Sequence, residues 1–340
     1  MKPIHRVHRT LLMALTVAGV GLSTSLHSIA QTTTSRIQPP KVDVATLNYR
    51  LSPRALADGV WVLEGAVEDF SRSNGCNIIN TGVIATPQGT WVVNTGPSFL
   101  YGQQQRQAVT QLLSQHKAGA VQQVLNLNLH PDYFFGNQAW RDVPTRALAG
   151  AIQGMQAEGG AYADNAYTLC GDWMKGTEST PAKEAIAPGR FKLGTHDIEL
   201  WRSHGHTADD LVLIDHSSGV VFAGGLVFTE RVPTMPHAKL DAWLVALDAL
   251  EAKLKPLKIK ALVPSHGPVR ADMQGLHQTR DYLRWLHQLL QDSAKAGLDL
   301  SEVIALPVPT RFARWGAIDT EYPRNVISLY PAHERAALVR

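Results

Sequence analysis

Residues 121–133 read VQQVLNLNLHPDY, an apolar run that passes directly into a histidine, a proline and an aspartate. The first seven of these residues predict a buried strand, so His130 and Asp132 come just after a strand end. His206 and His266 occur in the same setting, each in a loop that follows a strand-like run. A rigid sheet fixes the positions of side chains at strand ends. We therefore expect these four side chains to meet at one site.

Three imidazoles and one carboxylate are a ligand set that zinc or iron accepts. A metal held by His130, Asp132, His206 and His266 with one open position would lower the pKa of a bound water toward neutrality. The residue types therefore predict a site for one ion, with zinc expected ahead of iron. His204 and His237 also lie in loops and could add ligands, although exposed positions are the default expectation for loop histidines.

Turn signals and apolar periodicity divide the rest of the body into short strands and helices. The order is a three-stranded meander, then strands alternating with helices, then a second meander and a final strand-helix unit. This order predicts an α/β (α+β) domain in which two sheets are covered by helices, an αββα four-layer sandwich. The expected strands are 60–63, 78–85, 90–93, 121–127, 198–201, 211–214, 220–223 and 261–263, and the expected helices lie within 101–117, 151–175, 243–254 and 270–297.

The first 30 residues have the pattern of a secretory signal peptide. Three cations and no acid precede an uncharged run over 11–22, and small residues precede Gln31. The run is shorter than the roughly 20 residues that a spanning helix needs, and an uncleaved membrane anchor is the alternative. The expected organisation is a signal peptide over 1–30, a flexible arm over 31–53, the αββα domain over 54–300 and a C-terminal extension over 301–340.

Removal of the signal peptide makes the chain electrically neutral. It takes three of the 32 Lys and Arg residues and leaves 29, which equals the 29 Asp and Glu residues. A neutral chain without clustered cations is not expected to bind nucleic acid or to associate stably with a membrane. We expect a periplasmic or secreted protein, in which Cys76 and Cys170 form either one disulfide or two unpaired buried thiols.

Five short motifs in this order resemble the metallo-β-lactamase superfamily, over about residues 58–270. They are Asn94-Thr95-Gly96, Asn128-Leu129-His130-Pro131-Asp132-Tyr133, Gly205-His206-Thr207, Phe222-Ala223-Gly224-Gly225-Leu226-Val227-Phe228 and Pro264-Ser265-His266-Gly267. The stretches 171–178 and 233–237 resemble the exported branch called quinoprotein relay system zinc metallohydrolases. The resemblance implies a hydrolase with zinc at the mouth of an αββα sandwich.

The superfamily pattern is His-x-His-x-Asp-His, then a His in a Gly-His-Thr turn, a bridging Asp, and a last His before Gly. The second His of the motif matches His130, its Asp matches Asp132, the turn His matches His206, and the last His matches His266. The resemblance therefore implies that these four residues are the metal ligands.

Four positions depart from the same pattern. Asn128 replaces the first His, Tyr133 replaces the adjacent His, Gly225 replaces the bridging carboxylate, and Asn94 replaces the Asp of an Asp-Thr-Gly turn. An amide is a weak metal ligand and a glycine is none, so a two-metal site is not expected. Tyr133 could still act as a phenolate ligand if a metal lowered its pKa.

Two functions are therefore weighed. The first is an exported hydrolase with at most one metal, acting on an ester, amide or thioester, with Asp132 and Tyr133 as catalytic residues. The second is a non-catalytic binding or accessory protein, without metal, that serves quinoprotein alcohol oxidation. The partner is accordingly a small-molecule substrate or a component of a quinoprotein system, and a different metal chemistry is the remaining alternative.

Overall fold

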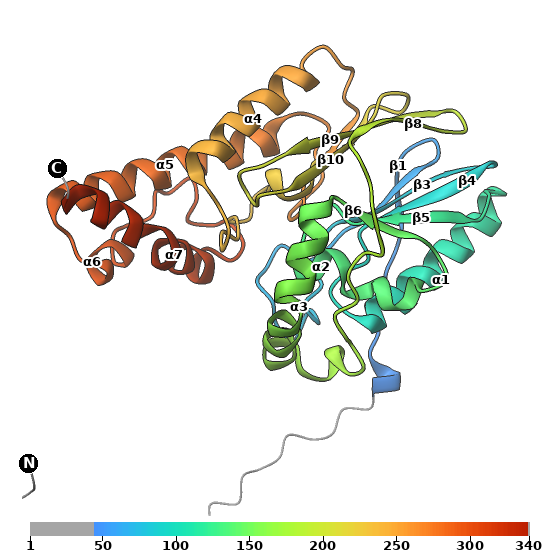
Figure 1. Cartoon of the computed structure of the whole chain (residues 1–340), viewed down its shortest axis with the longest axis horizontal. Helices are drawn as coiled ribbons and strands as arrows, with labels where there is room; N and C mark the ends of the chain where they lie inside the picture. The colour runs from blue at the N-terminus through green and yellow to red at the C-terminus, as the bar shows by residue number, and fades with distance from the viewer. Residues whose placement is uncertain (1–43, 339–340) are drawn as a thin grey trace, which may run out of the picture. The chain divides into compact units, whose positions relative to one another are not determined.

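The computed structural model describes residues 44–338 (Figure 1). The expected signal peptide and residues 31–43 of the expected arm lie outside this range. Within it, no helix has the length and apolar character required to cross a bilayer.

The first sheet has seven strands in the sequential order β1 to β7. Strands β1 to β4 form an antiparallel meander, and β4 to β7 pair in parallel. The meander that the sequence predicts is therefore confirmed. The strands are β1 (Arg54–Ala57), β2 (Val60–Leu63), β3 (Thr81–Thr86), β4 (Gly89–Val93), β5 (Val121–Leu125), β6 (Thr145–Ala147) and β7 (Glu184–Ala185).

The second sheet has five strands in the order β12-β11-β10-β9-β8. Strands β8 to β11 are antiparallel, and β12 pairs with β11 in parallel. The strands are β8 (Gly189–Leu193), β9 (His196–Ser203), β10 (Asp210–Asp215), β11 (Val220–Phe222) and β12 (Ala261–Val263).

The first helix begins and ends at recognisable sequence signals. Ser98 caps the first one by accepting a hydrogen bond from the backbone N–H of Tyr101 at 3.0 Å, and the left-handed residue Lys117 ends it. The α-helices are α1 (Phe99–His116), α2 (Pro131–Phe134), α3 (Ala149–Cys170), α4 (Leu240–Leu254), α5 (Gln274–Ala296), α6 (Leu300–Ile304) and α7 (Ile318–Leu338). The 3₁₀ helices are η1 (Val44–Thr46), η2 (Phe135–Trp140), η3 (Gly171–Met174) and η4 (Gly224–Leu226).

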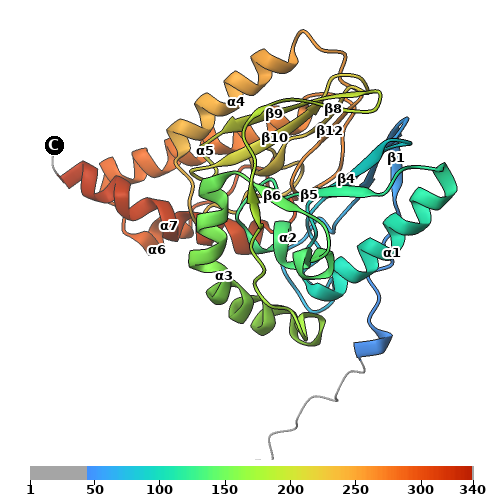
Figure 2. The same ribbon diagram turned by 45° about the vertical axis from the view of Figure 1, so that its right-hand side comes forward.

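Three clusters of buried apolar side chains define the layers. One lies between the two sheets, a second between the first sheet and α1, and a third between the second sheet and α4 and α5. Figures 1 and 2 show α1 and α4 along the outer sides of their sheets. Members are Val62, Ile84 and Leu213 in the first cluster, Val83, Val92 and Leu112 in the second, and Ile214, Leu247 and Leu286 in the third. Successive strand residues thus face different clusters, and the predicted αββα sandwich is confirmed.

Three expected strands differ from the observed ones by two or three residues at an end, and the one expected over 198–201 covers His196–Ser203. The strand expected over 78–85 begins at Thr81, and the one expected over 121–127 ends at Leu125. Helix α7 carries Pro323 and Pro331 within its length, which hides its helical pattern from a sequence-based prediction. It packs on α5, as seen in the 5.6 Å ring-centroid distance between Trp285 and Tyr322.

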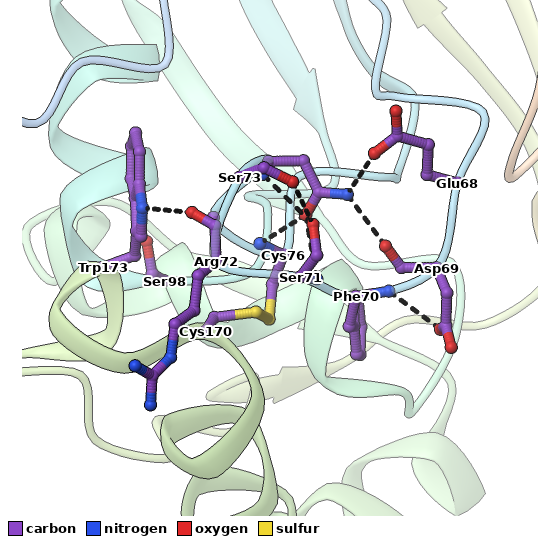
Figure 3. The surroundings of a disulfide bond; sticks show 12 residues. Glu68, Asp69, Phe70, Ser71, Arg72, Ser73, Cys76, Ser98, Cys170 and Trp173 are labelled. Carbon is purple, nitrogen blue, oxygen red and sulfur yellow. Dashed lines mark hydrogen bonds between the residues drawn. A yellow bond between two sulfur atoms is a disulfide. The ribbon is translucent and has the colours of Figure 1, made fainter.

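Cys76 and Cys170 form a disulfide with a Cα–Cα distance of 5.9 Å (Figure 3). The bridge joins the loop between β2 and β3 to the last residue of α3. Beside it, the indole N–H of Trp173 donates to the carbonyl of Arg72 at 3.0 Å. Of the two alternatives that the sequence allows, a disulfide or two unpaired thiols, the structure has the disulfide. Disulfides are typical of exported proteins.

Candidate functional site

A cavity of about 320 Å³ lies next to the ends of β5 and β12. Three of the four predicted ligands line it, namely His130, Asp132 and His266. The other lining side chains that matter here are apolar (Phe70, Ile78, Leu169 and Phe228) or charged (Asp69, Arg231, Glu321 and Arg324). The site is therefore a pocket with both an apolar and a charged wall.

The structure brings the four predicted side chains together. The rings of His130 and His206 have centroids 4.8 Å apart and are nearly perpendicular. Nε2 of His266 lies 3.3 Å from Oδ2 of Asp132. The ring of Phe228 lies against both remaining imidazoles, 5.8 Å from His206 and 5.0 Å from His266. All four ligand candidates are buried.

Hydrogen bonding fixes which nitrogen of His206 carries the proton. Its Nδ1 lies 3.1 Å from Oδ1 of Asp210, whose carboxylate also accepts from the backbone N–H and the hydroxyl of Thr207. A carboxylate only accepts, so Nδ1 is the protonated nitrogen. Nε2 of His206 is buried and has no hydrogen-bond partner. His206 thus carries a bare lone pair on Nε2.

The same reasoning applies to His130 through a second histidine. Nε2 of His237 lies 3.0 Å from a carboxylate oxygen of Glu158, which also accepts from the hydroxyl of Tyr162. Nδ1 of His237 lies 3.1 Å from Nε2 of His130. When His237 is neutral and donates from Nε2 to Glu158, its Nδ1 accepts from Nε2 of His130, and Nδ1 of His130 is then bare. His237 thus contacts the site, whereas His204 is exposed.

Burial sets the ionisation of the site. It lowers the pKa of His130 and of His266 well below the usual value, so both rings are neutral at physiological pH. Burial also raises the pKa of Asp132 to about 7. The pKa of Tyr133 is raised well above 10 by burial and then by the neighbouring Asp132. Tyr133 is therefore a neutral phenol at neutral pH, and its hydroxyl lies beside the side chain of Ser265.

Asn128, at the position of the missing first histidine, has a structural role. Its amide donates to Oδ1 of Asp210 at 2.7 Å and to the hydroxyl of Thr207 at 3.1 Å. Its carbonyl accepts from the backbone N–H of His130 at 3.1 Å. The side chain of Asn128 thus connects the loop of His130 to the carboxylate that orients His206.

Gly225 and Asn94 are also explained by their surroundings. A Cβ atom at Gly225 would lie 2.0 Å from Nδ1 and 2.4 Å from Cε1 of His206, so the imidazole fills the space where a side chain would begin. Asn94 has a φ of +57°, which asparagine tolerates, and its side chain accepts from the N–H of Leu127 at 3.0 Å. The position of Gly225 therefore leaves no room for a metal-bridging carboxylate on this backbone.

These residues do not fit a multi-ligand metal centre as they are arranged. Within 44–338, no three His, Cys, Asp or Glu side chains are placed to hold one ion. One pair has suitable spacing, because ligands of a tetrahedral zinc with bonds of about 2.0–2.1 Å lie roughly 3.3 Å apart. That pair is Asp132 and His266, whose facing atoms are 3.3 Å apart. Two ligands are fewer than the three that catalytic zinc sites use.

Solved structures identify the architecture, although no family model and no curated protein matches the sequence. The metallo-β-lactamase from Pontibacter korlensis is 20% identical, with a TM-score of 0.52 over 69% of this chain and 99% of that one. The metallo-β-lactamase IND-7 is 16% identical, with a TM-score of 0.54 over 70% and 100%. FIM-1 from Pseudomonas aeruginosa, solved in its mono-zinc form, is 18% identical, with a TM-score of 0.52 over 69% and 95%.

This chain has the metallo-β-lactamase fold. Identities at this level establish the metallo-β-lactamase fold alone, and the chemistry of this chain must be argued from its own residues. The pocket lies beside the strand ends from which the predicted ligands come, and charged side chains from outside the motifs complete its lining.

The charged wall of the pocket was missed by the sequence analysis. Arg231 is fully buried and its guanidinium lies 3.4 Å from Oε1 of Glu321, while Arg324 lies 2.7 Å from Asp69. Burial raises the pKa of Glu321, opposed by the nearby Arg231. Glu321 and Arg324 come from α7, outside the stretch 58–270 that resembles the superfamily, so no motif marks them. Arg231 follows Thr229 and Glu230 in the sequence, so nothing local indicates that this arginine is buried.

Proposed function

We propose that this protein binds a small organic molecule in the cavity beside His130 and Asp132 and acts without a two-metal hydrolytic centre. The close packing of His206 on Gly225 is the observation that supports this function. The imidazole of His206 fills the space that the bridging carboxylate of a metal centre would need. Asn128 stands at the position of the first histidine, and its amide donates hydrogen bonds to Asp210 and Thr207.

The pocket itself has the character of a ligand site. It combines aromatic and aliphatic walls with a few buried polar groups, as small-molecule sites do. Among the residues that line the cavity, Oδ2 of Asp132, Nδ1 of His266 and Oε2 of Glu321 are buried without a hydrogen-bond partner. Buried polar atoms without partners cost free energy, and a bound molecule that supplies the partners would recover it.

The proposal includes an exported location and a role in a quinoprotein system. The Cys76–Cys170 disulfide supports export, because such bridges persist in oxidising compartments. The quinoprotein role rests on the motifs at 171–178 and 233–237 and defines an accessory protein that holds a small molecule for alcohol oxidation.

Turnover assays test this function. The purified protein is incubated with generic esters, amides and thioesters, with added zinc and with a chelator, and zinc affinity is measured by calorimetry in parallel. We expect that zinc does not increase turnover and that the chelator does not reduce it, because no third metal ligand is in place. Chelator-sensitive hydrolysis of any of these substrates would overturn the proposal.

A metal-dependent hydrolase is the second candidate, and the 3.3 Å spacing of Asp132 and His266 favours it. The related fold of FIM-1 has been solved with a single zinc. For this chain, His130 or His206 would have to move to complete a set of three ligands. The same assays separate the two candidates, because only the hydrolase predicts tight zinc binding together with chelator-sensitive turnover.

A further inference from the structure

We infer that the turn after α4, together with the adjoining end of the second sheet, forms a basic surface that binds the anionic headgroups of a lipid bilayer. The proposal goes beyond the binding function of the cavity and does not depend on it. The cations of this basic surface are Arg190, Lys192, Lys253, Lys255, Lys258 and Lys260.

Backbone hydrogen bonds hold the turn after α4 against the second sheet. The N–H of Lys260 donates at 2.8 Å to the carbonyl of Gly219, in the turn between β10 and β11. In the same turn, the N–H of His216 donates at 2.9 Å to the carbonyl of Asp197 in β9. Figures 1 and 2 show the loop after α4 on the same side of the molecule as β8 and β9. The cations of the two segments therefore share one surface.

Two carboxylates, Asp197 and Glu199, lie among these cations, and both are paired. Asp197 pairs with Arg190 at 3.1 Å and with Lys192 at 3.5 Å. Glu199 pairs with Arg190 at 3.4 Å and with Lys253. Three cations thus use both negative charges of the basic surface.

The other three cations carry the excess of positive charge. Within residues 44–338, Lys255, Lys258 and Lys260 are exposed and form no ion pair. Glu251, the last acidic residue of α4, pairs with Arg280 of α5 instead. A lysine at a helix C-terminus can serve the helix dipole, but Lys258 and Lys260 lie beyond the end of α4. The helix therefore does not account for them.

The composition of the basic surface favours a bilayer over a protein partner. Protein interfaces are enriched in aromatic side chains and arginine and are depleted in lysine. Five of the six cations here are lysines, and the exposed large apolar side chains of the described residues all lie outside 253–260. Lysine is a hydrated point charge on a flexible stem, which suits mobile headgroups better than one fixed geometry.

The neutral charge of the expected mature chain hides this local excess. Composition predicts no cluster of cations, and the segment 253–260, with four lysines and no acid, is the exception. The attraction of each lysine to an anionic bilayer corresponds to about a fivefold gain in affinity. Three unpaired lysines therefore give weak and reversible binding, which differs from stable membrane association.

The basic surface and the cavity lie at opposite ends of β12. Lys260 directly precedes this strand, whereas His266, which lines the cavity, follows it. A bilayer that contacts Lys260 therefore meets the end of the strand away from the cavity, and the cavity stays accessible.

Co-sedimentation of the full mature protein with vesicles tests the proposal. Vesicles of phosphatidylcholine alone are compared with vesicles in which one third of the lipid is phosphatidylglycerol, at about 50 mM and about 500 mM NaCl. We expect binding to the anionic vesicles at low salt only, because salt screens exposed charges. No binding at low salt, equal binding to both kinds of vesicle, or binding that salt does not weaken overturns the proposal. Tighter binding to polyglutamate than to the anionic vesicles would assign the surface to an acidic polypeptide and would also overturn it.

A triple variant locates the binding surface. Lys255→Gln/Lys258→Gln/Lys260→Gln removes the three unpaired lysines and should weaken binding to the anionic vesicles about a hundredfold. Circular dichroism checks that this variant folds. If it does not fold, the lipid and salt comparisons on the unaltered protein still decide.

The matched control removes the same charge elsewhere. Lys183→Gln/Lys239→Gln/Lys295→Gln changes three exposed lysines outside the basic surface and should leave vesicle binding unchanged within about twofold. Equal losses in the two triple variants would show that net charge alone drives binding, and would contradict the assignment of this surface.

Discussion

Nδ1 of His206 lies 2.0 Å from the position that a Cβ atom would take at Gly225. The imidazole occupies the place where a bridging carboxylate would start, and its Nδ1 lies 3.1 Å from Oδ1 of Asp210. The absence of a side chain at Gly225 and the orientation of the His206 ring are therefore linked, because the ring fills the space that a side chain at Gly225 would need. This relationship explains why three imidazoles and one aspartate can meet without forming a three-ligand metal site.

Gly225→Asp should not restore metal binding. The new side chain collides with the ring of His206, so we expect a lower free energy of unfolding by about 1–3 kcal/mol and no gain in zinc affinity. Chemical denaturation and zinc calorimetry measure the two effects. Gly160→Asp is the matched control, because a Cβ at Gly160 meets nothing within 4 Å. A Gly225→Asp variant that binds zinc tightly at unchanged stability would contradict the packing argument.

The hydrogen-bond chains predict one tautomer for each site histidine. Long-range proton–nitrogen NMR correlations should show His206 protonated at Nδ1 and His130 protonated at Nε2. Glu158→Ala removes the acceptor of His237 and should turn His130 into a mixture of tautomers, without changing His206. Asp164→Ala, an exposed position on the same helix, is the control. Finding His130 protonated at Nδ1 in the unaltered protein would contradict a chain in which His130 donates to His237 and His237 donates to Glu158.

The disulfide should contribute strongly to stability. It closes a sequence separation of 94 residues, for which the chain-entropy model gives about 4–5 kcal/mol. We expect a reductant to lower the midpoint of urea unfolding in the unaltered protein and to have no effect on the Cys76→Ala/Cys170→Ala double variant. If the reductant does not change the urea midpoint of the unaltered protein, the bridge is absent.

The stability that Asp215 contributes at neutral pH should be lost in acid. Burial alone would raise the pKa of this carboxyl, but its hydrogen bonds to His196 and Ser218 outweigh burial and lower it. A lowered folded-state pKa gives stability that is present above the unfolded value of about 3.9 and is lost as the pH falls through the folded value.

The stability difference between Asp215→Asn and the unaltered protein should accordingly be largest near neutral pH and should shrink below about pH 4. Urea unfolding midpoints measured across this range check the expectation. Asp281→Asn, at an exposed helical position, should show no comparable pH-dependent difference. A difference for Asp215→Asn that grows as the pH falls would mean that the sign is wrong.

The sequence predicts the layers of the fold well because apolar periodicity reports them directly. Val83 and Ile84 alternate between two buried clusters, and Leu213 and Ile214 do the same in the second sheet. Short edge strands such as β7, with both residues exposed, carry no such pattern. Helix α7 escapes prediction because two prolines interrupt it.

The candidate site is only partly visible from the sequence. Strand-end position is enough to single out His130, which follows β5 of the first sheet, and His266, which follows β12 of the second, and the packing of the two sheets brings both to one cavity. It gives no information on ring orientation, which depends on Asp210, nor on the contact between His237 and His130. The charged wall requires residues far apart in the chain, and only folding places Arg231 beside Glu321.

The metal content of the mature protein, purified from its native compartment without added metal, decides between a binding protein and a metallohydrolase. The arrangement of His130, His206, His266 and Asp132 predicts less than about a tenth of a zinc or iron ion per chain by elemental analysis. A stoichiometry of about one ion per chain that survives dialysis would contradict it and would establish a complete metal site.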